Sequence, residues 1–404
     1  MRLIISFILL LSTAVLPYPV FAEKAATIDE LVKMYDIKPC AGCHADKYED
    51  WKTSTMGNSV VDPRVLLGMR SFIRLAIDEE KALKREDLRI CLNCHVPQIK
   101  DAAPELVVHI GDLILTAVED KNEHTRDAAK KELSKLNINC LGCHNLKALG
   151  FNAQPKPETI YVPHDHGMND ASAPHRAAGY ETRKSDLLVK SEFCATCHHC
   201  PPDVPWKECP TLYTTYIEDY IQKGHNETCQ DCHMKGSQAI HKFFGPNNPD
   251  FLKSSISLSV DARPTRFINI YKDEKTPAIV LQIGLKNNAG HVVPSGCALT
   301  PKMVLNVNVT DQDRKEIFSR QKVFTVGDLY FKGGKKVPMA EWDVTATEHF
   351  DLGIEPDKPY ASTYIIPLKD DTKSANVEVN LKYYYFRDEI FTVGEVVRKV
   401  LIGE

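Results

Sequence analysis

The pattern Cys-x-x-Cys-His occurs five times between residues 40 and 233, and it constrains the fold of this chain more than any other sequence feature. The copies begin at Cys40, Cys91, Cys140, Cys194 and Cys229. From the composition of the 404 residues, chance would supply roughly 0.015 copies. Any fold for this chain must therefore accommodate five sites of the same chemistry.

Cys-x-x-Cys-His is typical of covalent attachment of c-type haem. The two cysteines lie on one helical turn and can each form a thioether with a haem vinyl group, while the adjacent histidine binds the iron from its proximal side. The predicted attachment residues are Cys40, Cys43, Cys91, Cys94, Cys140, Cys143, Cys194, Cys197, Cys229 and Cys232. The predicted proximal ligands are His44, His95, His144, His198 and His233. Redox-active Cys-x-x-Cys sites or zinc sites would explain the cysteines but not a histidine after every pair.

The five motifs indicate shared attachment chemistry rather than a tandem repeat. Their starts are separated by 51, 49, 54 and 35 residues, and the intervening segments do not resemble one another. Five covalently bound haem c groups within about 210 residues would leave little room for an ordinary core. We therefore expect the porphyrins to be much of what the side chains pack against.

The number of distal ligands separates electron carriers from enzymes, because a catalytic haem keeps one axial position open. Ten histidines lie outside the motifs: His109, His124, His164, His166, His175, His199, His225, His241, His291 and His349. Five irons need five distal ligands, so the chain has enough histidines to fill every position.

Eight segments between Cys40 and Gly296 carry a family resemblance that runs from about Cys40 to the end of the chain. They are CHADKYEDWKTSTMGNSVVDP (43–63), CLNCHVP (91–97), CLGCHN (140–145), GMNDASAPH (167–175), SEFCATCH (191–198), TCQDCHM (228–234), HKFFG (241–245) and NNAGHVVPSG (287–296). Through them the chain resembles the exported multihaem cytochromes c related to the tetrahaem cytochrome of ammonia oxidisers and, more distantly, to hydroxylamine oxidoreductase. The resemblance implies that His175, His241 and His291 are distal ligands.

Met56 departs from the family pattern, which usually has histidine at this position. As a ligand, Met56 would give a Met/His iron of raised potential. As a gap-filler, it would pack beside Tyr48 and Trp51. The polar residues on both sides of Met56 favour the ligand.

The remaining candidates are His199, His225 and three cysteines outside the motifs. His199 follows a proximal histidine and either turns toward an adjacent haem or faces solvent, and His225 is expected to cap the end of the preceding helix. Cys200 and Cys209 bracket a short loop, and in an oxidising compartment a disulfide between them is the simplest account, with two free thiols as the alternative. Cys297 has no obvious partner and is expected to be buried and inert.

The first 22 residues indicate export. Arg2, an apolar run and Val20-Phe21-Ala22 are typical of a cleaved secretory signal peptide. No later stretch is apolar enough for a transmembrane segment. The formal charge is −4, which does not indicate nucleic-acid binding. We expect a periplasmic or extracellular protein.

The sequence predicts an α+β protein of two domains after the signal peptide 1–22. Residues 23–250 read as a helix-and-loop haem domain, with helices near 63–83, 104–118, 124–136 and 211–223 and a long loop over 150–182. Residues 251–404 read as an antiparallel β-sandwich, because strand alternation appears at 255–260, 278–285, 303–309, 360–367 and 377–386.

The sequence favours an exported electron carrier over an enzyme. It would pass electrons through closely packed haems between redox partners, such as a membrane quinol oxidoreductase or other cytochromes. The alternative is an oxidoreductase acting on a small nitrogen or sulfur compound at one open haem, although the Cys-x-x-Cys-Lys motif of pentahaem nitrite reductases is absent from the sequence. A third hypothesis is a structural role as a homo-oligomer or a subunit of a haem filament.

Overall fold

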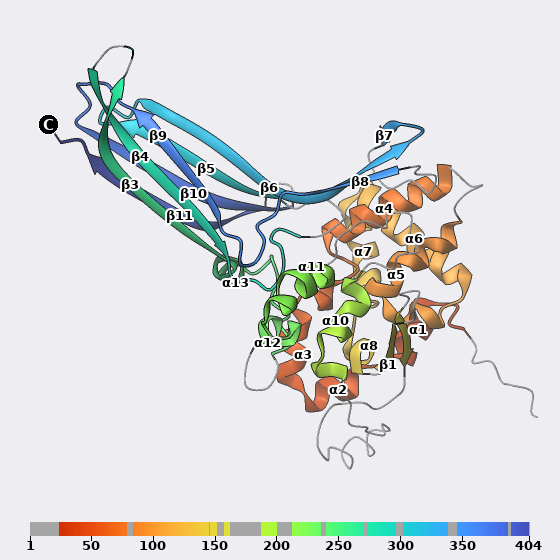
Figure 1. Ribbon diagram of the computed structural model, residues 1–404. Coiled ribbons are helices and arrows are strands. Elements are labelled where there is room, and N and C mark those ends of the chain that lie inside the picture. The colour runs from red at the N-terminus through yellow and green to blue at the C-terminus, as the bar shows by residue number, and fades with distance from the viewer. Residues whose placement is uncertain are drawn as a thin grey trace, which may run out of the picture.

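The computed structural model describes residues 24–78, 84–144, 146–151, 157–161, 187–199, 212–235, 240–269, 271, 274–295, 302–337, 346–386 and 389–403. Figure 1 shows helices from the first part of the chain gathered at one end of the molecule, with long antiparallel strands extending away from them. The predicted signal peptide 1–22 lies outside the described residues. Among the helices that are described, none is long and apolar enough to span a bilayer.

The helical part consists mostly of short helices and 3-10 turns. In chain order these are α1 (Ile28–Met34), α2 (Lys38–Cys43), α3 (Ala45–Lys52), η1 (Met56–Asn58), α4 (Pro63–Asp78), η2 (Arg85–Leu88), α5 (Arg89–His95), η3 (Pro97–Asp101), α6 (Pro104–Glu119), α7 (Glu123–Ser134), α8 (Cys140–His144), η4 (Leu187–Val189), α10 (Ser191–His198), α11 (Leu212–Asp219), η5 (Ile221–Lys223), α12 (Cys229–His233) and α13 (Pro249–Ser255).

The predicted helices are confirmed with small changes at their ends. The two helices expected at 104–118 and 124–136 are α6 and α7, and the helix expected from Pro63 is α4. Proline opens both α4 and α6, where its missing N–H costs nothing. The helix expected at 211–223 breaks into α11 and η5, and Gly224 ends the latter with a φ of 99°.

The loop expected over 150–182 is partly wrong. Strands β1 (Leu146–Phe151) and β2 (Pro157–Tyr161) pair antiparallel, with Phe151 opposite Pro157. The strands are too short to produce a clear alternation in the sequence, and only their pairing defines them. Residues 152–156 and 162–186 lie outside the described part of the chain.

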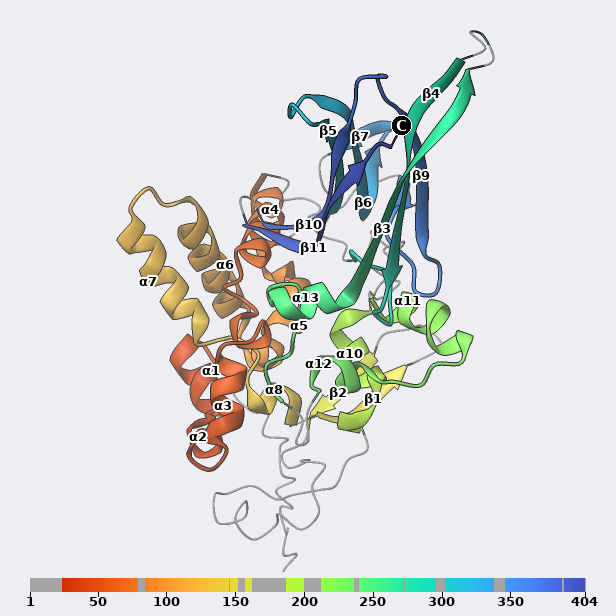
Figure 2. The same ribbon diagram turned by 90° about the vertical axis from the view of Figure 1, so that its left-hand side faces the viewer.

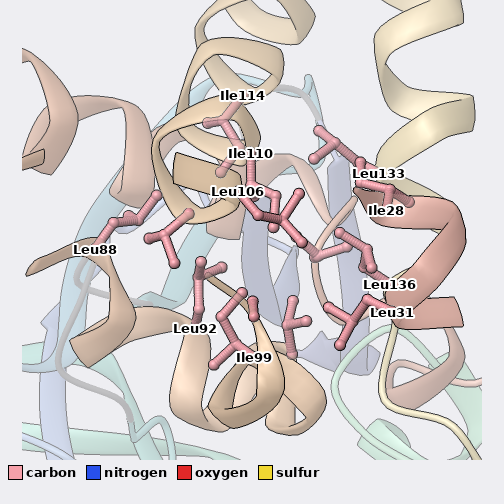
Figure 3. Packing of buried hydrophobic residues seen from close by; sticks show 14 of the residues in the cluster. Ile28, Leu31, Leu88, Leu92, Ile99, Leu106, Ile110, Ile114, Leu133 and Leu136 are labelled. Atoms are coloured by element: carbon pink, nitrogen blue, oxygen red, sulfur yellow. The ribbon is translucent and has the colours of Figure 1, made fainter. Parts of the chain in front are cut away.

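An aliphatic core holds α1, α4, α5, α6 and α7 together. Figure 3 shows Leu106, Ile110 and Ile114 of α6 pointing toward Leu88 and Leu92. Each of these side chains is almost fully buried, and burying one contributes about 1.5 to 3 kcal/mol. The expectation that haem contacts replace an ordinary core is therefore wrong for this half of the helical part, because the long amphipathic helices between motifs supply enough apolar surface.

Within the described residues, the C-terminal part contains nine strands in two antiparallel sheets. They are β3 (Ile256–Asn269), β4 (Glu274–Asn287), β5 (Lys302–Asp311), β6 (Glu316–Lys332), β7 (Lys335–Val337), β8 (Ala346–Asp351), β9 (Tyr360–Pro367), β10 (Ser374–Phe386) and β11 (Glu389–Leu401). One sheet has the order β11-β10-β5-β6-β7, with β8 also paired to β6, and the other has the order β3-β4-β9. The helices and antiparallel sheets together make the α+β fold that the sequence predicts.

All five predicted strands are confirmed, as β3, β4, β5, β9 and β10. The sequence missed β6, β7, β8 and β11. In β11 most side chains are exposed or half-buried, and valines such as Val397 point outward. Because apolar and polar residues do not alternate cleanly there, the pairing with β10 and not the side-chain pattern defines this strand.

The two sheets share one apolar core. Alternate residues of β4, including Leu281 and Leu285, are buried together with Leu305 of β5 and Val379 of β10. The rings of Phe324 of β6 and Tyr360 of β9 contact each other edge to face across the two sheets, with centroids 5.0 Å apart. This core makes the sheets a rigid support for the loops at their ends.

The sheets and the helices contact each other through polar groups at both ends of the junction. The hydroxyl of Tyr385, near the end of β10, donates to the Asp62 carboxylate at 3.2 Å, and the Arg64 guanidinium lies 3.9 Å from the Tyr385 ring centroid. Elsewhere along the junction His225 Nε2 lies 3.0 Å from Asp357 Oδ2. Figures 1 and 2 show α13 leading directly into β3 at this boundary.

Candidate haem-binding site

All five Cys-x-x-Cys-His motifs lie on or at the end of short helices. The second to fifth motifs lie entirely within α5, α8, α10 and α12, respectively. The first motif begins within α2, which ends at Cys43, and His44 is the cap residue of that helix. One helical turn brings both cysteines and the histidine of a motif to the same end of the helix. The helix that the attachment chemistry requires is therefore present at every motif.

Cysteines from different motifs lie next to one another. The thiols of three pairs are within hydrogen-bonding range: Cys40 with Cys140, Cys94 with Cys197, and Cys194 with Cys229. Burial raises the pKa of the Cys143 thiol to about 12, and the nearby Cys197 adds to this effect. Both views in Figures 1 and 2 show α8, α10 and α12 gathered together. The motifs therefore form one cluster in which the fourth motif contacts the second and the fifth and lies near the third.

In three of the histidines Nδ1 bonds a backbone carbonyl, so the lone pair that could bind a metal is on Nε2. Nδ1 of His95 lies 3.0 Å from the Ser59 carbonyl, Nδ1 of His233 lies 2.5 Å from the Phe244 carbonyl, and Nδ1 of His291 lies 2.9 Å from the Val292 carbonyl. A carbonyl can only accept, so Nδ1 carries the proton in each case. This arrangement, a ring N–H donated to the backbone, is how metal-ligating histidines are usually oriented.

The Ser59 contact is reinforced from both sides. Ser59 Oγ donates to the His95 carbonyl at 2.8 Å and accepts from Ile138 N at 2.8 Å. Trp51 Nε1 donates to the Ile138 carbonyl at 2.6 Å. These bonds fix the segment between the first and second motifs against Ile138, which lies just before the third motif.

Two pairs of histidine rings have the separation of imidazoles on opposite sides of one metal. His144 and His241 have ring centroids 6.2 Å apart and planes inclined by 16°, and His233 and His291 have centroids 6.3 Å apart and planes inclined by 8°. A metal–imidazole bond of about 2.0 Å, with the centroid about 1.1 Å behind the nitrogen, gives about 6.2 Å across the metal. Rings in direct contact are closer, as in Tyr220 and His225, with centroids 4.1 Å apart.

Burial favours the neutral ring at four of the histidines: His95, His198, His233 and His291. It lowers the pKa of His198 and of His291 to about 4, and it lowers the pKa of His95 and His233 below the ordinary value. The proximity of His233 and His95 lowers the pKa of His198 further. A metal binds the neutral ring, so the protonation state suits an iron ligand. The residues at these positions fit a haem iron held between two imidazoles.

Met56 lies in a turn that is bound to the second motif. It begins η1 and is half-buried, and Ser59 N donates to its carbonyl at 3.2 Å. A side chain at the next residue, Gly57, would meet the Trp51 carbonyl, so the turn can only be this tight with glycine there. The Met56 turn is therefore held rigidly within three residues of the carbonyl that orients His95.

The other sequence candidates are placed as follows. The ring of His199 lies edge-on to Tyr213, with centroids 5.6 Å apart. His175, Cys200 and Cys209 lie outside the described residues, as do His164, His166 and Cys297. The expectation that His225 caps the preceding helix is confirmed for its backbone, because His225 N donates to the Tyr220 carbonyl at 3.4 Å. Its ring stacks on Tyr220, and its Nε2 pairs with Asp357 across the junction.

Sequence reasoning missed the residues that orient the ligands. The carbonyls of Ser59, Phe244 and Val292 act through the backbone, which carries no side-chain signal. Asn287 is a further example: it is buried, and its amide donates to the carbonyls of His291 and Ile354 at 2.8 and 2.7 Å.

The comparisons with known proteins give a fold. No protein-family model matches the sequence, and no curated protein matches it significantly. Among solved structures, a penta-haem cytochrome c552 from Thermochromatium tepidum is similar over 93% of this chain and 99% of that chain, with 17% identity and a TM-score of 0.60. The chain therefore has the fold of a multihaem cytochrome c.

Two further structures match only a part. A structural-genomics target designated SoR45 covers 37% of this chain with 13% identity and a TM-score of 0.21. A β-galactosidase-like protein from Bacteroides fragilis covers 35% of this chain with 14% identity and a TM-score of 0.18. The similarity to the cytochrome covers both the helices and the sheets.

Proposed function

We propose that this protein is an exported pentahaem cytochrome c that transfers electrons between redox partners. The observation that carries the proposal is the pairing of His144 with His241 and of His233 with His291 at the spacing of two ligands on one metal. In each pair the first member closes a Cys-x-x-Cys-His motif, and the second comes from a segment that is remote in sequence. Both axial positions of these two irons would then be filled, as in electron carriers.

Haem c at the five motifs would be held by the ten motif cysteines and the five motif histidines. His241 and His291 are the proposed distal ligands at the third and fifth motifs. For the remaining three, the candidates are Met56, His175 and His199. Bound haem would supply a reversible one-electron iron couple.

The protein groups around each iron would tune that couple. Hydrogen bonds from His95, His233 and His291 to backbone carbonyls make the opposite nitrogen more basic and hold the ring in one orientation. Contacts between cysteines of the first and third, second and fourth, and fourth and fifth motifs support close spacing of the haems. A continuous path from the first motif to the fifth is what an electron carrier requires.

The domain organisation belongs to the same proposal. Residues 23–250 would form the haem domain and residues 251–404 a β-sandwich domain, with the signal peptide 1–22 removed on export to the periplasm or the cell surface. The shared core of the two sheets supports the sandwich. The sandwich supplies one ligand, His291, from the loop that follows β4. Partners would be a membrane quinol oxidoreductase or other cytochromes.

The test combines haem quantification with electron paramagnetic resonance of the purified, oxidised protein. We expect five haems per chain, all low-spin and unaffected by cyanide, hydroxylamine or nitrite. His241→Ala and His291→Ala should each convert one iron in five to a high-spin, cyanide-binding form. A high-spin, ligand-binding iron in the unmodified protein would instead support the oxidoreductase hypothesis, and unchanged spectra in both variants would refute the ligand pairs.

A further inference from the structure

We propose that Tyr220 is a positioning residue for His291 and thereby controls the ligation of the fifth haem. The inference rests on the proposed function, because it takes His291 to be a distal ligand. The carrying observation is the contact between Tyr220 and Gly290, the residue before His291. A Cβ added at Gly290 would lie 3.2 Å from Cδ1 and 3.4 Å from Cε1 of the Tyr220 ring.

The loop that presents His291 is fixed firmly on the side of the sheets. Asn287 donates to the His291 and Ile354 carbonyls and accepts from Ala289 N at 2.7 Å. Val293 and Ile354 exchange two backbone hydrogen bonds, at 3.1 and 2.8 Å. The loop can therefore move relative to the helices only together with the end of β4 and the segment around Ile354 that follows β8.

On the helical side, Tyr220 is held in place from two directions. Its hydroxyl donates to Glu227 Oε2 at 2.8 Å, and its ring stacks on His225 with planes inclined by 6°. His225 Nε2 reaches Asp357 Oδ2 at 3.0 Å, and Asp357 lies in the segment that pairs with Asn287 through Pro356. The contacts form a closed circuit from the helices through His225 and Asp357 to the sheets, and back through Gly290 to Tyr220.

This circuit sets the distance that ligation requires. His233 belongs to α12 and His291 to the loop after β4, so no covalent segment shorter than 58 residues joins them. A ligand position is useful only within about 0.2 Å of the bond length. Carbon atoms prefer separations of about 3.5 to 4.0 Å, so a methyl group at Gly290 must displace either the loop or the Tyr220 ring by a few tenths of an ångström.

The experiment compares Gly290→Ala with Gly68→Ala in the haem-loaded protein. A Cβ at Gly68 meets nothing within 4 Å, so this variant controls for the substitution itself. We expect Gly290→Ala to convert up to one iron in five to a high-spin form in the paramagnetic resonance and visible spectra, and to shift the potential of that haem. Gly68→Ala should leave the spectra unchanged.

Variants of Tyr220 separate the ring from the hydroxyl. Tyr220→Phe keeps the surface on which Gly290 rests and should retain five low-spin irons, whereas Tyr220→Ala should resemble Gly290→Ala. Asp357→Asn, a milder change on the surface, should give a smaller shift of the same haem potential. Haem content and circular dichroism establish that each variant has matured and folded.

The outcomes distinguish this inference from the proposed function. Unchanged spectra and potentials in both Gly290→Ala and Tyr220→Ala would overturn the positioning role if His291→Ala still converts one iron. Unchanged spectra in His291→Ala would overturn the ligand assignment itself. If Tyr220→Phe had the same effect as Tyr220→Ala, the hydroxyl bond to Glu227 and not the ring would be the positioning contact, and the inference as stated would be wrong.

Discussion

Asn287 offers a quantitative test of how the sheets hold His291. Its amide donates to two carbonyls, and its oxygen accepts from Ala289 N, all at 2.7 to 2.8 Å, with the side chain 4% exposed. Asn287→Ala leaves Ala289 N and the His291 carbonyl without their partner, whereas the Ile354 carbonyl keeps the hydrogen bond from Val293 N. Each buried group that loses its only partner costs about 1 to 3 kcal/mol, so the two groups together with the weakened Ile354 contact should cost about 3 to 5 kcal/mol.

Urea denaturation followed by far-ultraviolet circular dichroism of the strands measures this cost. With a denaturant slope of about 2 kcal/mol per molar, the midpoint should fall by about 1.5 to 2.5 M. The neighbouring Asn288 is the matched control, because its amide bonds to Ser254 O and Ser257 Oγ are exposed to solvent. Asn288→Ala should lower the free energy of unfolding by less than about 1 kcal/mol.

The same variant links stability to ligation. Because Asn287 holds the His291 carbonyl, Asn287→Ala should also produce a high-spin fraction of one iron, and Asn288→Ala should not. Equal denaturation midpoints for the two variants, with five low-spin irons in both, would refute the claim that buried hydrogen bonds at Asn287 fix the ligand loop.

Three further predictions concern other parts of the molecule. If Met56 ligates iron, Met56→Ala should lower the potential of one haem and add a high-spin signal, whereas Met56→His should give a low-spin iron of lower potential. A redox titration of Met56→Ala followed by spectra would exclude ligation if neither the potentials nor the spin states change. The guanidinium groups of Arg74 and Arg70 lower the pKa of Glu119 to about 2 from 4.5, so its ion pairs stabilise the protein above pH 4.5 and are lost as the pH falls toward 2. In Glu119→Gln the free energy of unfolding should therefore fall less between pH 4.5 and 2, and the same pH dependence in both proteins would contradict the pairing. The double variant His241→Ala/His291→Ala should contain two high-spin irons, and a single one would mean that both histidines serve the same haem.

The sequence alone is enough to predict the attachment residues of the candidate site, because the covalent chemistry fixes their types and spacing. The five motifs need no tertiary information, because two cysteines and a histidine within one turn identify the attachment point. The structure adds that every motif is helical, or ends a helix, and that cysteines of different motifs touch. Which histidine faces which could not be read from the sequence. His241 and His291 were named through a family resemblance, whereas their placement opposite His144 and His233 depends on contacts between segments that are distant along the chain.

The interpretation of His225 shows the limit of local reasoning. Its position after a helix predicted a cap, and its backbone N–H does bond the Tyr220 carbonyl. The local sequence could not show that its ring also stacks on Tyr220 and that Nε2 reaches Asp357, which is 132 residues away. The same holds for Gly290, whose significance depends on a ring from another element.

The sequence by itself determined the five predicted attachment points, the α+β class and the strands with clear alternation, because the Cys-x-x-Cys-His motifs, the helix starts at Pro63 and Pro104, and the alternating burial in β4 and β5 are local properties. Tertiary structure alone decided which sheet edges pair, as with the half-exposed β11, and which histidine rings face each other. Those outcomes follow from the burial of apolar faces against each other and from hydrogen bonds between distant backbone groups. Both depend on contacts between segments that are distant along the chain, and the local sequence does not show which distant segments will meet.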